Sequence, residues 1–311
     1  MSVPLVTGPQ RDPLVSVVMP CYNGSRTIRR ALLSLIMQDF PSPYEVIVVD
    51  SSSDGTDVIV REEFPEVQLI RRETRTLPGA ARNVGVRRAR GDIIAFLDSD
   101  CVADRSWLHR LVSAYGPEVA GVGGSVANGN PGSLVGWASF LIEFARLAPS
   151  SPRRLVSDVP SCNCSYRRWV FDKYGFYHDG DFGAEDMHFN WRLARGGVRL
   201  LFEPHAVVYH LNRERVGDFL RHMRHVGEGV GLVRLLEGMS HTSLSRHWWL
   251  SAAALPCRVA RIAWRGLRWR FLDAWRLPVV LPLIVAGFVA FSLGELGASR
   301  NGMRAAEARS A

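Results

Sequence analysis

The chain has 311 residues, of which 47% are hydrophobic and 22% charged, a composition that excludes an intrinsically disordered protein. Its formal net charge is +8, carried almost wholly by Arg, because Lys173 is the only lysine. This charge forms no compact basic block with interleaved aromatic residues, so we expect no nucleic-acid partner. Arg binds phosphate groups and anionic membrane surfaces, although genomic base composition explains an Arg bias equally well.

Strand and helix signals alternate from residue 14 to residue 97. Short apolar runs that end at Pro or acidic residues predict buried strands, and apolar residues three and four apart predict amphipathic helices. The expected strands are 14–19, 44–49, 67–70 and 93–97, and helices are expected at 28–36, after the loop 51–56, and at 78–89. This βαβαβαβ order predicts an α/β fold with a mostly parallel, doubly wound sheet and right-handed crossovers.

The pattern is less regular after residue 100. We expect helices at 108–115, 134–147 and 185–195, and strands at 119–126, 162–166 and 198–202. Five cysteines occur, an odd number whose spacing matches neither a disulfide framework nor a zinc motif, which predicts reduced thiols in the cytosol. Residues 1–12 lack the apolar core of a signal peptide, so the catalytic part is expected on the cytoplasmic side.

The last 75 residues differ in character from the rest. Residues 247–264 are apolar and aromatic but carry two Arg, a pattern typical of an amphipathic helix at a membrane interface. Leu277 to Gly294 is an uncharged stretch of 18 residues, or roughly 27 Å of helix, which just spans a hydrocarbon core. Arg on both flanks leaves its orientation open, and a surface-lying hairpin or a buried core helix remain alternatives. We expect a catalytic domain over 1–236 and a membrane-associating region over 237–311.

Two carboxylates, Asp98 and Asp100, follow the apolar run 93–97 with only Ser99 between them. Open α/β sheets bind ligands at the carboxyl ends of their strands, and two carboxylates there repel each other unless a cation lies between them. Mg²⁺ and Mn²⁺ take oxygen ligands and bridge to diphosphates. The alternative is one helix N-cap and one solvated acid.

Three further polar clusters should meet Asp98–Asp100 at the same sheet edge. They are Pro20–Gly24 after the first strand, Asp50 with Asp54–Thr56 after the second, and Gly79–Asn83 at the start of a helix. A carboxylate there can accept ribose or base donors, and an Arg at a helix N-terminus can bind phosphate. The Gly-x-Gly-x-x-Gly fingerprint of dinucleotide-binding folds is absent after the first strand, which disfavours an NAD-linked enzyme.

These motifs, together with CNCSYRR (162–168), GAED (183–186), WRL (191–193) and PHAVVYH (204–210), resemble the family-2 glycosyltransferases, which have the GT-A fold. The resemblance covers roughly residues 14–212. It implies a nucleoside-diphosphate sugar as donor and Mg²⁺ or Mn²⁺ as cofactor. The implied donor-binding residues are Pro20, Tyr22, Asn23, Asp50, Asp54, Arg82, Asp98 and Ser99. Asp100 would ligate the metal, and His210 is either a second ligand or a hydrogen-bonded histidine at a strand end.

The resemblance also assigns the acidic pair Glu185 and Asp186, with Asp186 as the general base. A sugar hydroxyl is a poor nucleophile until a carboxylate takes its proton, and an opposed base without an enzyme nucleophile inverts the anomeric centre. The alternative is ordinary acidic charge at a helix N-terminus.

The region 221–227 reads RHMRHVG, whereas processive synthases of this family carry Gln-x-x-Arg-Trp there. This difference favours transfer of a single sugar, and it leaves His222 and His225 as a solvated helix face or as phosphate contacts. We expect an inverting, membrane-associated hexosyltransferase at the cytoplasmic face of the membrane, whose acceptor is a glycan, a polyprenyl-linked sugar or a glycolipid. A non-catalytic nucleotide-sugar-binding or scaffold protein is the alternative, and a nucleotidyltransferase is disfavoured because the loop at 21–24 lacks a Gly-rich basic pattern.

Overall fold

The structure is a computed structural model that describes residues 12–180, 183–239, 243, 247–268 and 275–310. By their contacts these residues form two compact units, which we describe separately. Unit 1 lies within residues 1–129, 152–180 and 188–210, and unit 2 within 130–151, 181–187 and 211–311.

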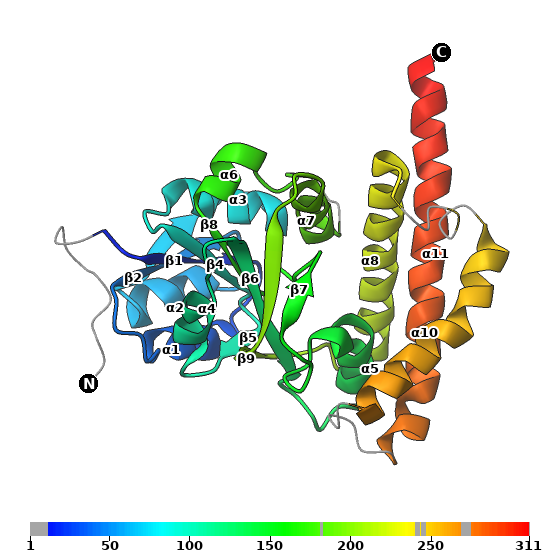
Figure 1. Ribbon diagram of the computed structural model, residues 1–311, viewed down its shortest axis with the longest axis horizontal. Helices are drawn as coiled ribbons and strands as arrows, with labels where there is room; N and C mark the ends of the chain where they lie inside the picture. The colour runs from blue at the N-terminus through cyan, green and yellow to red at the C-terminus, as the bar shows by residue number, and fades with distance from the viewer. Residues whose placement is uncertain (1–11, 181–182, 240–242, 244–246, 269–274, 311) are drawn as a thin grey trace. The chain divides into compact units, whose positions relative to one another are not determined.

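The first half of unit 1 is the predicted alternation of strands and helices (Figure 1). The strands β1 (Val15–Cys21), β2 (Tyr44–Asp50), β3 (Gln68–Arg71) and β4 (Ile93–Leu97) are all parallel, in the order β3-β2-β1-β4. The helices between them are α1 (Ile28–Ile36), α2 (Thr56–Glu63) and α3 (Pro78–Arg88). Every residue of β2 and β4 is buried, as expected of parallel strands covered on both faces. Chain order reverses between β1 and β4, which is where such sheets bind ligands.

The second half of unit 1 makes the sheet mixed. Its elements are β5 (Cys101–Ala103), α4 (Trp107–Ser113), β6 (Val119–Asn128), β7 (Arg154–Val156), β8 (Asn163–Arg167), α6 (Trp169–Tyr174), α7 (Glu185–Arg195, whose first three residues belong to unit 2) and β9 (Arg199–His210). Strand β8 lies antiparallel between β4 and β6, while β9 is parallel to β6 and antiparallel to β5 and β7. Neighbouring parallel strands need a crossover connection, usually a helix. Because the regular helical crossovers stop after β4, the remaining strands pair in both directions.

Strand β9 is longer than predicted. The sequence pattern suggested an end at Phe202, but the strand continues to His210. Its register against β6 slips between Glu203 and Val207, so residues 204–206 bulge out of the ladder. Pro204 has no amide hydrogen to donate to the ladder, so the pairing is interrupted there. This interruption explains why the sequence pattern predicted only the first part of the strand.

Unit 2 consists of helices: α5 (Leu134–Glu143), the short 3-10 helix η1 (Ala145–Leu147), α8 (Val216–Glu237), α10 (Trp248–Arg268) and α11 (Arg276–Ser310). Helix α11 runs beside α8 (Figure 1). Glycines allow this close approach, since a Cβ on Gly227 would lie 2.0 Å from the Phe291 carbonyl oxygen.

Helix α11 contains the uncharged stretch singled out in the sequence. Among the described residues it is the one helix long and apolar enough to cross a membrane, over Arg276–Ala298 with a mean hydropathy of 2.3. Near the end of this span Glu295 is fully buried and forms ion pairs with Arg234 of α8 and Arg258 of α10. A helix is present where the interfacial helix was expected, as α10. It runs to Arg268, four residues farther than predicted.

Candidate functional site

The loops that follow β1 and β2 are tied together by hydrogen bonds. Asn23 adopts a positive φ of 53° at the turn, its amide donates to Ser52 Oγ (2.7 Å), and its Oδ1 accepts from the Ser53 amide (2.9 Å). Asp54 Oδ2 accepts from the Ser25 amide (3.1 Å). Burial raises the pKa of Asp54, but these and neighbouring hydrogen bonds outweigh it and lower the pKa on balance. The two loops therefore form one rigid rim of the sheet edge.

Asp50 is the last residue of β2 and is fully buried. Its Oδ1 accepts hydrogen bonds from the amide and hydroxyl of Ser52, and its Oδ2 lies 3.3 Å from Arg71 Nη1. Across the ladder Asp50 pairs with Cys21, and burial raises the pKa of that thiol to about 12. A buried carboxylate that already accepts these donors is held in one orientation at the edge.

Pro20 and Tyr22 flank Cys21 at the end of β1. Pro20 is partly buried, whereas the Tyr22 ring is 45% exposed and has the Arg75 guanidinium 4.9 Å from its centroid. An exposed aromatic ring beside a cation is a suitable surface for a nucleobase or for a phosphate-bearing ligand.

Arg82 and Asp98 form an ion pair between α3 and the end of β4. The Arg82 side chain is 3% exposed, that of Asp98 is 28% exposed, and Nη2 lies 2.7 Å from Oδ1. Burial raises the pKa of Asp98, opposed by the Arg82 charge and reinforced by that of Asp100. The helix N-cap alternative for these acids is wrong, because Asp98–Asp100 lead into strand β5 and not into a helix.

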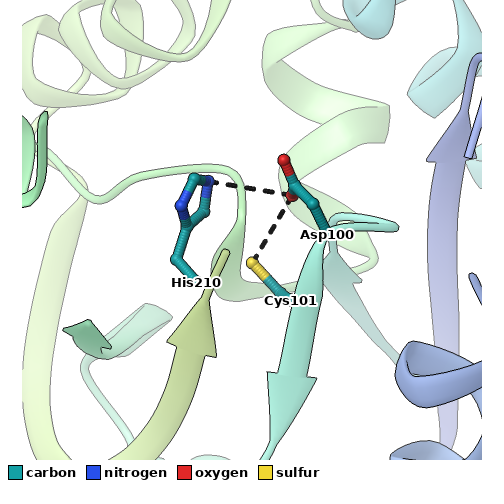
Figure 2. Close-up of side chains that lie close together, drawn as sticks. All are labelled: Asp100, Cys101 and His210. Carbon is teal, nitrogen blue, oxygen red and sulfur yellow. Dashed lines mark hydrogen bonds and ion pairs between the residues drawn. The ribbon is translucent and has the colours of Figure 1, made fainter. Parts of the chain in front are cut away.

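Asp100, Cys101 and His210 gather at the ends of β5 and β9 (Figure 2). One potential ligand atom of each lies within 4.8 Å of the others; His210 Nε2 is 3.7 Å and Cys101 Sγ 3.9 Å from Asp100 Oδ1. The antiparallel pairing that sets Cys101 opposite His210 creates this cluster. Burial raises the pKa of the Cys101 thiol well above its usual range. A carboxylate and an imidazole beside a protonated thiol suit Mn²⁺ or Mg²⁺ better than a thiolate-preferring metal.

The sequence analysis missed Cys101. It follows Asp100 directly, but its pairing with His210 depends on a three-residue strand that has no periodicity of its own. Ser99 lies between the two acids and is partly exposed. The donor-site and metal residues expected in unit 1 thus lie along the carboxyl ends of β1, β2 and β4 and beside β5, as predicted for one sheet edge.

Glu185 and Asp186 open helix α7 and belong to unit 2. Asp186 Oδ1 accepts from the Met187 amide at 2.7 Å, and the preceding Ala184 is buried against Val230 and Val233 of α8. The assignment of this acidic pair to the reaction remains a prediction.

His222 does not lie on the solvated face that the sequence suggested. Its Nε2 is 2.8 Å from Glu143 Oε2 of α5, and its side chain is 19% exposed. Only His225 is exposed, so the two histidines have different surroundings although they lie three residues apart. The partner 79 residues away could not be inferred from helical spacing.

Comparison with known proteins identifies the family of the chain. The family profile described as "Glycosyl transferase family 2" matches residues 16–175. The chain is 31% identical over 236 residues to the glycosyltransferase AglE of Haloferax volcanii, covering 73% of this chain and 76% of AglE. It is 30% identical over 217 residues to the pre-mycofactocin glycosyltransferase of Mycobacterium tuberculosis, covering 66% of this chain but only 44% of that protein.

Solved structures share the fold at lower identity. The mannosyltransferase PcManGT from Pyrobaculum calidifontis, solved with GDP-Man and Mn²⁺, superposes with a TM-score of 0.56 at 22% identity, covering 98% of this chain and 84% of that one. Residues 1–349 of Staphylococcus aureus TarS, solved with UDP-GlcNAc, give a TM-score of 0.51 at 20% identity, covering 93% and 92%. The expected GT-A fold is thereby confirmed.

Proposed function

The chain belongs to glycosyl transferase family 2, and from that premise we propose that it moves a single sugar from a nucleoside-diphosphate sugar to a hydroxyl group, with inversion at the anomeric carbon. One observation carries the proposal. Asp50, the Arg82–Asp98 pair and the Asp100–Cys101–His210 cluster all lie at the carboxyl edge of the parallel strands in unit 1. This is the arrangement that a nucleotide sugar and a cation require together.

Different residues of unit 1 would bind different parts of the nucleotide-sugar donor. Tyr22 offers an exposed ring for the nucleobase, and Asn23, Asp50 and Asp54 line the rim where base and ribose donors would be accepted. Asp98 would accept a hydrogen bond from a ribose or sugar hydroxyl. Its Oδ1 lies 2.7 Å from Arg82 Nη2, and this ion pair would position the Arg82 guanidinium near the diphosphate. Ser99 would contact the donor from between the two acids.

Asp100 and His210 would hold Mn²⁺ or Mg²⁺, with the protonated Cys101 thiol beside them. These metal ligands fit such a cation, because a carboxylate oxygen and an imidazole nitrogen lie within 4.8 Å of each other at the sheet edge. When bound, the ion neutralises charge on a diphosphate leaving group. PcManGT was solved with Mn²⁺, which supports the same requirement here.

Asp186 would act as the general base, taking the proton of the acceptor hydroxyl as its oxygen attacks the anomeric carbon. Glu185 beside it would orient the acceptor. With no enzyme nucleophile assigned, attack on the face opposite the leaving diphosphate gives inversion. The absence of the Gln-x-x-Arg-Trp run supports release after one sugar.

The acceptor is proposed to be a glycan or a polyprenyl- or glycolipid-linked sugar at the cytoplasmic face of the membrane. Helix α11 has the hydropathy of a membrane span. Helix α10, which carries four Arg residues, exposes Trp249 and Trp264 by 56% and 59%. Vesicle co-sedimentation tests this part. Replacing Trp249 and Trp264 with Ser should release the protein from anionic vesicles, whereas Trp169→Ser, an exposed indole of unit 1, should not.

The catalytic proposal is tested by measuring donor turnover and donor binding in the same variants. Asp186→Asn should lower transfer by roughly 10²- to 10⁴-fold while donor affinity stays within about twofold. Asp218→Asn, an exposed acid in the first turn of α8, is the matched control and should leave both unchanged. Equal turnover in the wild type and Asp186→Asn would instead favour a nucleotide-sugar-binding protein without this base. A panel of UDP-, GDP- and dTDP-sugars with Mn²⁺ in thermal-shift assays identifies the donor.

A further inference from the structure

A cavity lies in unit 1 at the end of the sheet away from the metal cluster. It has a volume of about 570 Å³ and is formed by the starts of β6 and β9, the end of β8, and helix α6. Strand β9 runs from Arg199, which lines this cavity, to His210 of the metal cluster. Because residues 204–206 bulge out of the ladder, the span is measured along β6, whose residues Val119 and Asn128 pair with Arg199 and His210. Its nine steps at about 3.3 Å each separate the two places by roughly 30 Å. One small ligand cannot occupy both places.

The cations that line the cavity differ in how they are engaged. Arg199 is paired with Glu118. Arg167 donates from Nε to the Val119 carbonyl (3.1 Å) and from Nη2 to the Gly116 carbonyl (3.2 Å). These bonds to neutral carbonyls hold its guanidinium in place, 5.0 Å from the centroid of the Tyr115 ring. No carboxylate of the described residues lies within 4.0 Å of it.

Lys173 is exposed and, among the described residues, has no carboxylate within 4.0 Å of its ammonium group. The ammonium lies 5.3 Å from the ring centroid of Tyr174. With three cations against one carboxylate, the lining attracts an anion.

Two aromatic side chains stand beside these cations. The Trp169 indole is 43% exposed, and its ring centroid is 6.4 Å from that of Tyr174 with the planes inclined by 50°. Such rings do not form the parallel slot that clamps a planar base. A single exposed face does suit a pyranose ring, whose C–H groups carry slight positive charge and pack on the negative face of the indole.

Trp169 and Tyr174 form an aromatic wall of the cavity, and Tyr174 is held rigidly. Tyr174 Oη donates to the Gly196 carbonyl at 3.1 Å, and its ring packs so closely that a Cβ on Gly196 would lie 2.3 Å from it. A preformed wall loses little conformational entropy on binding.

We propose that this cavity is a second binding site, for an anionic saccharide whose sugar ring packs on Trp169 and whose carboxylate lies between Lys173 and Arg167. The site does not depend on the proposed transfer reaction, because it shares no residue with the donor edge. It would hold an acidic glycan on the same domain while the donor edge remains free.

The lone lysine makes the test direct. Acylation of Lys173 by an amine-reactive ester, followed by peptide mass spectrometry, reports occupancy of the cavity in the full-length protein. A hexamer of galacturonic acid should slow labelling of Lys173, whereas neutral maltohexaose and inorganic pyrophosphate should not. UDP with Mn²⁺ should leave the protection unchanged.

Calorimetric titration of the galacturonate hexamer supplies the second measurement. Lys173→Gln and Trp169→Ala should each weaken binding roughly tenfold, while Arg30→Gln, which removes an exposed charge from α1, should change it less than twofold. Both cavity side chains are exposed, so these variants should fold normally. Equal protection by pyrophosphate, displacement by UDP, or equal effects of Lys173→Gln and Arg30→Gln would each overturn the proposal.

Discussion

The pairing of Glu143 with His222 makes a quantitative prediction about stability in acid. Burial alone would raise the pKa of Glu143. The charge and hydrogen bond of His222, the charge of Arg213 and the hydroxyl of Ser139 outweigh this effect and lower the pKa from its ordinary value of 4.5 to about 2. Ser139 Oγ donates to the carboxylate at 2.7 Å, and His222 Nε2 lies 2.8 Å from it. The carboxylate side chain is only 17% exposed, so solvent screens these interactions weakly.

A carboxyl group with a depressed pKa in the folded state stabilises that state above its unfolded pKa. Its contribution is lost as the pH falls from about 4.5 to about 2. At 1.36 kcal/mol per pKa unit, the loss amounts to about 3 kcal/mol. Glu143→Gln removes this titration, so its free energy of unfolding should decline less than that of the wild type between pH 5 and pH 2.5.

Urea unfolding followed by circular dichroism at several pH values measures the difference. Asp218→Asn on α8 is the matched control, because its ion pair with Arg221 is exposed and should contribute about 0–1 kcal/mol at most. Parallel pH profiles for the wild type and Glu143→Gln would refute the linkage argument.

Five further substitutions test contacts at three other places in the chain. Asp98→Asn should destabilise unit 1 by about 3 kcal/mol because it removes a carboxylate 2.7 Å from the buried Arg82 guanidinium. Arg82→Met should cost about 1 kcal/mol because the Asp98 side chain is 28% exposed and water reaches its carboxylate; equal losses in thermal unfolding would contradict the burial argument. Gly91→Ala would place a Cβ 2.6–2.9 Å from backbone atoms of β1 and should cost more than about 2 kcal/mol, and a variant as stable as the wild type would show that the backbone there yields. Gly227→Ala should lower the melting temperature, because the added Cβ would push α8 away from α11. Gly297→Ala is the control and should not lower it, since its Cβ would meet nothing within 4 Å. Similar melting curves for the two variants would argue against the close helix contact.

Local sequence patterns were sufficient for the parallel half of the sheet. The strands β1, β2 and β4 are mostly apolar runs with polar residues at or just after their carboxyl ends, so the positions of both could be predicted. Helix α7 was also predicted with its observed bounds, Glu185–Arg195.

The features that were missed depend on partners distant in sequence. The strands β5 and β7 have three residues each, too few for any periodicity, and they exist because β9 pairs with them. The same pairing brings Cys101 to His210. The antiparallel insertion of β8 likewise follows from contacts on both of its sides and not from its own five residues.

The central claim is that residues from distant parts of the chain hold one divalent cation beside a nucleoside diphosphate. Electron paramagnetic resonance of Mn²⁺, titrated with and without UDP or GDP, measures this directly. We expect one site whose affinity increases when the nucleotide is present, and which Asp100→Asn and His210→Gln each weaken at least tenfold. His109→Gln, on the exposed face of α4, should leave it unchanged. Unaltered Mn²⁺ affinity in the Asp100 and His210 variants would contradict the account.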